Sequence, residues 1–214
     1  MRKFILLLSV FALFISCEKE EMVDPLIALE ERAKADDEAL VAYMKAHKLV
    51  IDEESDSPNN VNWEIKGLSG LDGPDTKSLW DLMGSDPIVW DYEGIEFNIY
   101  YYEIEEGAGV NPKVADRLSV DYNAYVMPDE LVDASVKTSV KFDLSSLIGA
   151  WQLAVPMFKT GAKEDGFPVD CDECDPYREQ ITQPGKGIIL SPSALAYGQD
   201  IMRFDMVLYD IEEK

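Results

Sequence analysis

Residues 118–135 read LSVDYNAYVMPDELVDAS, and residues 142–151 read FDLSSLIGAW. Apolar and polar residues alternate over the first six positions of the first stretch, which predicts a β-strand with one buried face. Apolar residues at helical spacing begin at Ile148, but Pro156 has no N–H to donate, so the helix should be short. Together the two stretches predict a sheet packed on one short helix.

More strands are expected on both sides of this helix. Runs rich in β-branched and aromatic residues occur at 95–104, 140–144, 188–190 and 204–211. Strands that enclose a single helix predict an α+β fold, in which an antiparallel sheet is wrapped on that helix.

A longer helix is predicted near the start of the chain. Asp24 and Pro25 supply an N-cap and a proline at the first helical position. Apolar residues then recur at helical spacing as far as about Ala46. The polar face is rich in Glu and Asp, so this helix should pack on its own domain or space that domain from a membrane.

The segment that follows the helix carries weaker signals. Residues 52–60 read DEESDSPNN and indicate a linker or exposed loop. Residues 63–65 suggest a short strand, and residues 75–83 suggest one or two helical turns ended by Gly84. We expect a linker and accessory segment here and attach no chemistry to it.

Composition bounds the size and the partners of the protein. The 214 residues are 47% hydrophobic, enough for one sizeable core, so we expect one main domain. Forty-two acidic residues against 19 basic ones give a net charge of −23, spread along the chain. Such a charge repels phosphate backbones, so nucleic acid is not expected as a partner.

The first residues have the pattern of a secretory signal. Arg2 and Lys3 precede the apolar run 4–15, which is too short to span a bilayer and is followed by Ser16 and Cys17. The sequence LFISC resembles the lipobox of bacterial lipoproteins, although Phe14 stands where that family usually has Leu. The resemblance implies cleavage after residue 16 and a lipid on Cys17, with an ordinary signal peptide as the alternative.

The lipoprotein resemblance also predicts a location. Residues 17–21 read CEKEE, which is similar to the export signal of surface lipoproteins in Bacteroidetes-type bacteria. We expect an outer-membrane anchor through Cys17, and the CEKEE pattern favours display on the cell surface.

The two remaining cysteines, Cys171 and Cys174, lie within DCDECD at 170–175. In an oxidising compartment a close, even pair indicates a local disulfide. Free thiols, or a metal held jointly with the carboxylates, are the second interpretation. Redox activity is the third and least favoured interpretation. The surrounding carboxylates should raise the pKa of the thiols and so lower the fraction of the reactive thiolate. The segment lacks the alternating ligands and glycine of an EF-hand loop, so no dedicated metal site is predicted.

Several blocks in the second half of the chain resemble FKBP-type peptidyl-prolyl isomerases. The blocks are GAG at 107–109, the two stretches quoted first, Gly161 with Lys163, PSALAYG at 192–198 and RFDMVLYDI at 203–211. They occur in the family's order and spacing. The resemblance divides the chain into a signal peptide (1–16), a tether (17–23), an N-terminal helix (24–48), a linker and accessory segment (49–94) and an FKBP-like domain (95–214) with an insertion at about 164–185.

The resemblance implies a proline-binding pocket. Its catalytic positions fall on Tyr122, Asp133, Ile148, Trp151 and Tyr197. Its further substrate-binding positions fall on Val132, Phe142, Leu147 and Phe204. Trp151 would form the floor, Ile148 N–H and the Tyr197 hydroxyl would each bind a substrate carbonyl, and Asp133 would orient polar groups. The apolar members can equally be ordinary core residues.

The chain departs from the family pattern at several positions. Val132 replaces a usual pocket Phe, Ser145 and Ala150 replace glycines, and Asp121 adds a carboxylate near the site where many members have His. Only residues 199–203 join AYG to the last strand, where active members have a longer loop over the pocket.

These observations support two functions. The first is an exported peptidyl-prolyl isomerase that acts on proline-containing polypeptides, without a cofactor, and assists folding of envelope or surface proteins. The second is a non-catalytic binding module that serves as an accessory subunit of an outer-membrane complex. The shortened loop and Val132 favour the second, and the pocket residues that match the family favour the first.

Overall fold

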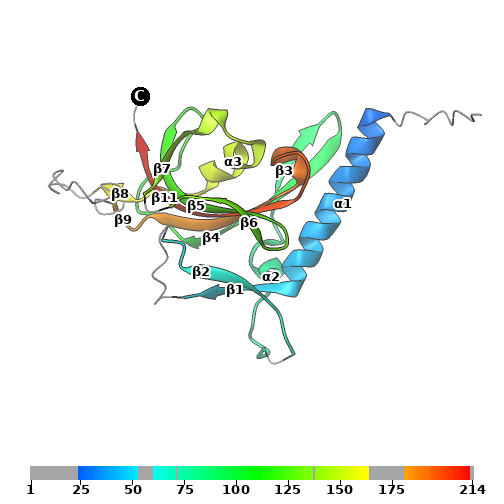
Figure 1. The fold of residues 1–214 in the computed structure, drawn as a ribbon, viewed down its shortest axis with the longest axis horizontal. Helices are drawn as coiled ribbons and strands as arrows, with labels where there is room; N and C mark the ends of the chain where they lie inside the picture. Colours follow the sequence, from blue (N-terminus) through cyan, green and yellow to red (C-terminus); the bar gives the residue numbers. More distant parts are fainter. Residues whose placement is uncertain (1–23, 53–59, 71, 137, 164–180, 213–214) are drawn as a thin grey trace, which may run out of the picture.

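A computed structural model describes residues 24–52, 60–70, 72–136, 138–163 and 181–212. Its main element is a seven-stranded antiparallel sheet that curls around the short helix α3 (Gly149–Ala154), as Figure 1 shows. The sheet order is β3 (Ile88–Tyr92), β4 (Ile95–Glu105), β10 (Gly185–Ser191), β11 (Met202–Glu212), β5 (Arg117–Val126) and β6 (Glu130–Ala134), and β7 (Val140–Asp143) also pairs with β5. The predicted α+β fold is confirmed.

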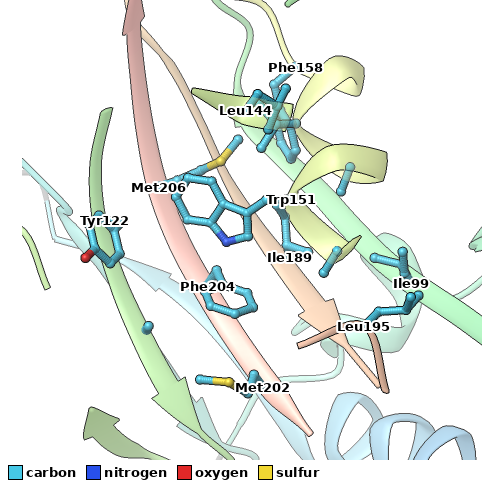
Figure 2. Close-up of a cluster of buried hydrophobic side chains, with 14 of the residues drawn as sticks. Ile99, Tyr122, Leu144, Trp151, Phe158, Ile189, Leu195, Met202, Phe204 and Met206 are labelled. Carbon is cyan, nitrogen blue, oxygen red and sulfur yellow. The ribbon is translucent and has the colours of Figure 1, made fainter. Parts of the chain in front are cut away.

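The face of the sheet toward α3 carries the larger apolar core. Alternate residues of β11 point to this face and are at most 1% exposed: Met202, Phe204, Met206 and Leu208. Figure 2 shows Trp151 of α3 beside Phe204 and Met206. Burying one such side chain contributes about 1.5–3 kcal/mol, so this core holds α3 against the sheet.

The opposite face of the sheet is also covered. The hairpin of β1 (His47–Ile51) and β2 (Trp63–Gly67) packs there together with α2 (Leu79–Met83). Trp63, Leu79 and Met83 are nearly fully buried and belong to one apolar cluster with Val207 of β11. The predicted strand and the helical turn that ends at Gly84 are present. The segment predicted as a linker and accessory segment (49–94) therefore contributes a second core.

Helix α1 (Pro25–Ala46) links the two cores. Its start is capped by Asp24, whose side chain accepts a hydrogen bond from Leu26 N at 3.0 Å. Ala33 packs in the core on the α3 side of the sheet, whereas Leu40 and Met44 pack in the core on the other side. The predicted helix is confirmed, and it packs on its own domain. None of the helices in the described ranges is both long and apolar enough to cross a membrane.

Strand β3 extends the sheet beyond the predicted domain boundary. It forms a hairpin with β4 through Glu93 and Gly94, which both have positive φ, of 53° and 85°. Trp90 on β3 lies 5.5 Å from Phe97 on β4, ring centroid to ring centroid. The sheet thus begins at Ile88 rather than at the predicted residue 95, because pairing with β4 and this aromatic contact hold the edge strand in place.

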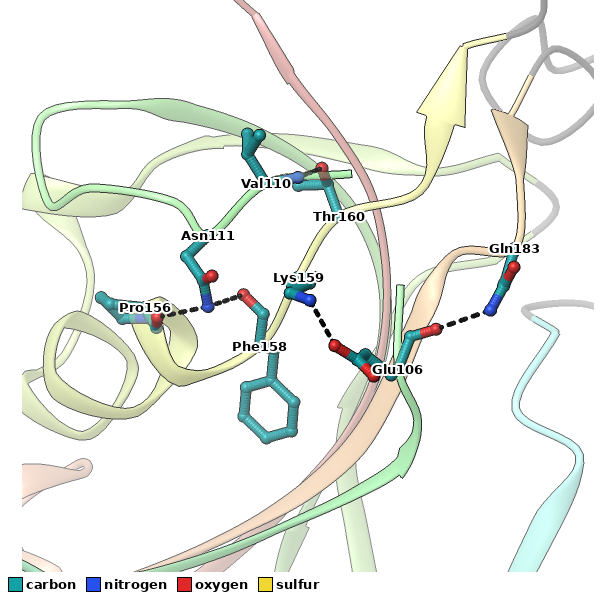
Figure 3. Close-up of polar contacts among 8 residues, drawn as sticks. All are labelled: Glu106, Val110, Asn111, Pro156, Phe158, Lys159, Thr160 and Gln183. Atoms are coloured by element: carbon teal, nitrogen blue, oxygen red, sulfur yellow. Dashed lines mark hydrogen bonds and ion pairs between the residues drawn. The ribbon is translucent and has the colours of Figure 1, made fainter. Parts of the chain in front are cut away.

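Pro156 ends α3, as predicted. The chain continues as one 3₁₀ turn, η2 (Val155–Met157), whose last carbonyls need partners outside the helix. Asn111 supplies them by donating from Nδ2 to the carbonyls of Pro156 and Phe158, both at 3.0 Å, as Figure 3 shows. The loop that begins at Gly107 therefore fixes the end of α3.

Polar contacts also tie together the base of the predicted insertion. Strand β8 (Ala162–Lys163) pairs with β9 (Ile181–Thr182), and residues 164–180 lie outside the described residues. Lys159 forms an ion pair with Glu106, whose carbonyl accepts a 3.1 Å hydrogen bond from Gln183 Nε2 (Figure 3). The insertion therefore leaves the domain from a fixed base.

Candidate functional site

Three strands and the first turn of α3 direct aromatic rings into one pocket. Alternate residues of a strand point to opposite faces, so Tyr122 of β5, Phe142 of β7 and Phe204 of β11 all face α3. Trp151, in the first turn of α3, contacts all three rings, and Figure 2 shows it between the strands that carry Tyr122 and Phe204 and the helix.

The pocket has a volume of about 280 Å³. Its lining residues are Tyr122, Asp133, Phe142, Ser146, Leu147, Ile148, Trp151, Tyr197 and Phe204. The structure thus brings together every predicted pocket residue except Val132, and their predicted roles stay predictions. Ser146 was not predicted, since nothing in its sequence context separates it from other loop serines.

Trp151 lines the pocket from the first turn of α3. It is only 4% exposed, and its ring meets Tyr122, Phe142 and Phe204 nearly edge to face, at interplanar angles of 89°, 82° and 82°. Edge-to-face contacts of this kind stabilise aromatic clusters beyond simple burial. The three neighbouring rings therefore hold the indole of Trp151 in one orientation.

The polar side of the pocket is built by Tyr122 and Asp133. The Tyr122 hydroxyl donates to Asp133 Oδ2 at 2.7 Å, and Asp133 Oδ1 accepts from Ala134 N at 2.9 Å. Burial, followed by the hydrogen bond and the charge of Asp133, raises the pKa of Tyr122 well above its usual value. Tyr122 is therefore a neutral donor, and Asp133 is held in one orientation.

Ile148 presents a backbone donor at the start of α3. It is the N-cap residue, and its carbonyl accepts from the amides of Trp151 and Gln152. Within the described residues its own N–H has no acceptor. Gln152 Nε2 donates to the Leu147 carbonyl at 2.6 Å and so fixes the backbone just before this N–H.

The two glycine replacements near this helix are accommodated. Ser145 is exposed, and Ala150, the second residue of α3, is fully buried in the main core. Helix α3 still begins at Gly149, so neither replacement closes the pocket.

Tyr197 reaches the pocket from the loop between β10 and β11. Its side chain is 58% exposed, and burial together with the charge of Asp133 raises the pKa of its hydroxyl. The loop begins with the 3₁₀ turn η3 (Ser193–Leu195), and Gly198 takes a positive φ of 83° directly after Tyr197. As the sequence indicated, only a few residues then lead into β11, which begins at Met202.

Val132 and Asp121 lie away from the pocket. The β5–β6 register shifts between Ala124 and Tyr125, which leaves Val132 as an extra residue on β6, 46% exposed and outside the pocket lining. Asp121 neighbours Tyr122 on β5, so it points to the opposite face, where it accepts from Tyr209 Oη at 2.7 Å. The expectation that Asp121 adds a carboxylate near the site was wrong.

The predicted lipidation and disulfide residues Cys17, Cys171 and Cys174 lie outside the described residues. In the part of the chain that is described, no group of three His, Cys, Asp or Glu side chains is arranged to hold a metal ion. The lining of the pocket supplies aromatic rings, the hydroxyls of Tyr122, Ser146 and Tyr197, and the carboxylate of Asp133.

Comparison with known proteins gives structural likenesses only. No protein-family model matches the chain, and no curated protein matches it. A peptidyl-prolyl cis-trans isomerase from Pseudomonas syringae pv. tomato is similar at 21% identity and a TM-score of 0.41, over 60% of this chain and 84% of that one. FkpA from Escherichia coli is similar at 20% identity and a TM-score of 0.42, over 60% of this chain and 54% of that one. The N-terminal domain of FKBP42 from Arabidopsis thaliana is similar at 11% identity and a TM-score of 0.39, over 60% and 94%.

Proposed function

We propose that the chain is a peptidyl-prolyl cis-trans isomerase that acts on proline-containing polypeptides. The observation that carries the proposal is the pocket itself, in which an indole floor is ringed by aromatic walls and bordered by separate polar groups. A prolyl ring is apolar and compact, and its two flanking carbonyls accept hydrogen bonds. The pocket supplies surfaces that suit both features.

Isomerisation of an X-Pro bond needs no nucleophile, metal or proton transfer. Its barrier of about 18–20 kcal/mol comes from the loss of amide resonance on twisting. The twisted amide has less charge separation than the planar one. Transfer from water to an apolar pocket therefore costs the twisted amide less free energy than the planar amide. A group that binds more tightly to the twisted geometry than to the planar one lowers the barrier.

The pocket residues suit distinct parts of this reaction. Trp151 would support the prolyl ring, between Phe142 and Phe204. The free N–H of Ile148 would bind one substrate carbonyl, and the hydroxyl of Tyr197 would bind the other. Asp133, oriented by Tyr122, would favour the twisted carbonyl by its charge and by the polar groups that it aligns.

A peptide assay tests the proposal. The full chain in mild detergent should accelerate isomerisation of a set of X-Pro peptides, and Asp133→Ala should remove most of that acceleration. Activity that is identical in the two proteins would point to a contaminant or to another site, and a lack of activity with every peptide would reject the proposal.

Two observations favour a second candidate function, a non-catalytic binding module of an outer-membrane complex. Tyr197 is more than half exposed, and β11 begins only five residues after it, which leaves little chain to cover the pocket. Under this alternative a partner protein would supply the missing cover. Co-purification of an outer-membrane partner that survives both Asp133→Ala and Tyr197→Phe would favour it.

We further propose that the protein is exported and anchored to the outer membrane through lipid on Cys17. The support is the signal-like run 4–15 and the lipobox-like LFISC. Metabolic labelling with a radioactive fatty acid should mark the wild-type chain and not Cys17→Ala. Protease treatment of intact cells would then separate surface display from the periplasmic face.

A further inference from the structure

We infer that Arg32 and Asp36 of α1 are positioning residues for the pocket loop 193–199, and we call this pair the α1 brace. The two residues lie one helical turn apart, so their side chains share a face of the helix. That face meets the loop that carries Tyr197. The catalytic part of this inference rests on the proposed isomerase function, whereas the structural part does not.

Ser193 is the point at which the brace holds the first half of the loop. Asp36 Oδ2 accepts from Ser193 N at 2.8 Å and from Ser193 Oγ at 2.5 Å. Arg32 Nε donates to the same Oγ at 2.8 Å. Ser193 is fully buried, so these bonds to charged side chains are shielded from water on the serine side.

Arg32 also holds the far end of the loop. Its Nη2 donates to the carbonyl of Gln199, two residues after Tyr197. Inside the loop, the Ser193 carbonyl accepts from the amides of Ala196 and Gly198, on either side of Tyr197. Both ends of a seven-residue segment are therefore fixed to one helix, with Tyr197 between them.

The braced loop also supports the start of α3. Leu195, 7% exposed, lies so close to Gly149 that a Cβ at that position would be 3.0 Å from Leu195 Cδ2. Gly149 follows Ile148, whose N–H is the proposed backbone donor. Through this loop, α1 thus supports both groups that are proposed to bind the substrate carbonyls, the Tyr197 hydroxyl and the Ile148 N–H.

This arrangement gives α1 a second role besides packing on the sheet, which is to position the hydroxyl of Tyr197. The connection from Tyr197 to β11 is short, and within the described residues Tyr197 makes no hydrogen bond of its own. Without the brace, the position of the Tyr197 hydroxyl would depend on the internal bonds of the loop and on the packing of Leu195. Displacement of a binding group by about 1 Å can lower a rate by roughly 100-fold, so the brace bears directly on catalysis.

Asp37 provides a matched control for Asp36. It is the next residue on α1, and it also joins α1 to the domain, because Asp37 Oδ1 accepts from Asn98 Nδ2 at 2.9 Å and from Tyr100 Oη at 2.8 Å. These partners lie on β4 and not on the loop. Asp36→Ala and Asp37→Ala therefore each remove two hydrogen bonds of α1, but only the first releases the loop.

The first measurement is backbone amide hydrogen exchange in the full chain in detergent. Asp36→Ala should accelerate exchange at Ser193 and Gly198 by roughly tenfold or more, in line with the loss of hydrogen bonds to a charged group. Arg32→Ala should do the same for Gly198, and Asp37→Ala should leave both amides within about twofold of wild type. Unchanged exchange in both brace variants would overturn the inference.

The second measurement is catalysis in a double-mutant cycle. Asp36→Ala should lower kcat by roughly fivefold or more with little change in KM, and it should have no further effect in a Tyr197→Phe background. Asp37→Ala should retain wild-type kcat. Accelerated exchange with unchanged kcat, or additive effects with Tyr197→Phe, would overturn the positioning role.

The two measurements separate this inference from the proposed function. If the wild-type chain has no isomerase activity, the proposed function fails and so does the catalytic part of the brace. The exchange rates still decide whether Arg32 and Asp36 hold the loop. If the chain is active and exchange is unaffected, the brace alone fails.

Discussion

The hydroxyl of Tyr122 lies 2.7 Å from Asp133 Oδ2 and donates to it across the rim of the aromatic pocket. This bond couples the pocket's phenol on β5 to its carboxylate on β6. Each group therefore holds the other in place, and the removal of either partner should affect both.

The first prediction concerns this pair. Asp133→Ala should lower kcat/KM by roughly tenfold or more, because it removes the carboxylate and frees the Tyr122 ring hydroxyl. Tyr122→Phe should lower it less, and the double variant should resemble Asp133→Ala. Glu130→Ala, an exposed carboxylate on the same strand, is the control and should keep wild-type kcat/KM. Equal losses in the control would point to general charge effects.

The second prediction is a flat alkaline pH profile. Burial and the neighbouring Asp133 raise the pKa of both Tyr122 and Tyr197 above the usual value of 10. A raised pKa keeps a phenol protonated to higher pH, so both hydroxyls remain donors. Measured kcat/KM should therefore stay within about twofold between pH 7 and pH 9.5. A sigmoidal loss centred below pH 9.5 would contradict the assigned donors.

The third prediction separates pocket from core with two phenylalanines. Phe142 lines the pocket, whereas Phe158 is fully buried in the same apolar core but outside the pocket lining. Phe142→Leu should weaken binding of a proline peptide by roughly tenfold. Phe158→Leu should lower the free energy of unfolding by about 1–2 kcal/mol and leave binding nearly unchanged. Titration calorimetry and urea unfolding measure the two quantities, and similar binding losses in both variants would contradict the pocket.

Most of the pocket was predictable because its residues lie on elements with clear local patterns. The alternation on β5 orients Tyr122, and the helical spacing that begins at Ile148 places Trp151 in the first turn of α3. The same alternation should have placed Asp121 on the opposite face, a signal that the family comparison obscured. The position of Val132 depends on a register shift between β5 and β6, which no local sequence pattern predicts.

The packing partners of the sheet were harder to predict because they are distant in sequence. Residues 49–94 contain an acidic, proline-bearing loop, and this composition suggested a linker. Trp63 and Leu79 are nevertheless buried in one apolar cluster with residues more than one hundred positions away, such as Val207. The α1 brace could not be predicted for the same reason. Asp36 and Ser193 are far apart in the sequence, and no local pattern indicates that the fold brings them into contact.

The fourth prediction tests a buried contact between α1 and the sheet. Tyr43 Oη accepts from Arg203 Nη1 at 2.8 Å, and Arg203 is only 4% exposed. Tyr43→Phe should lower the free energy of unfolding by roughly 1–3 kcal/mol, because a buried donor loses a partner. Tyr92→Phe, at a tyrosine that is 43% exposed, should change it by less than about 0.5 kcal/mol. Urea unfolding of both variants checks the difference, and equal stabilities would show that the Tyr43 hydroxyl contributes nothing.

The fifth prediction follows from Asp205, which lies 1% exposed on the face of β11 away from the pocket. Burial raises its pKa to about 6, although the nearby Arg203, with Nε 3.3 Å from Asp205 Oδ1, opposes the rise. The folded protein therefore binds a proton on Asp205 more tightly than the unfolded chain does. The stability that this proton contributes is complete below about pH 4 and is lost as pH rises through about 6.

Asp205→Asn removes this titration while it keeps the shape of the side chain. Between pH 4 and pH 7 the variant should gain on the order of 2 kcal/mol in unfolding free energy relative to wild type, since each pKa unit corresponds to about 1.4 kcal/mol. Urea unfolding at several pH values measures the difference, and other carboxylates cancel because they are common to both proteins. Asp86→Asn at an exposed position controls for the loss of one charge. Curves of wild type and Asp205→Asn that run parallel across this range would show that Asp205 ionises equally well in the folded and unfolded chain.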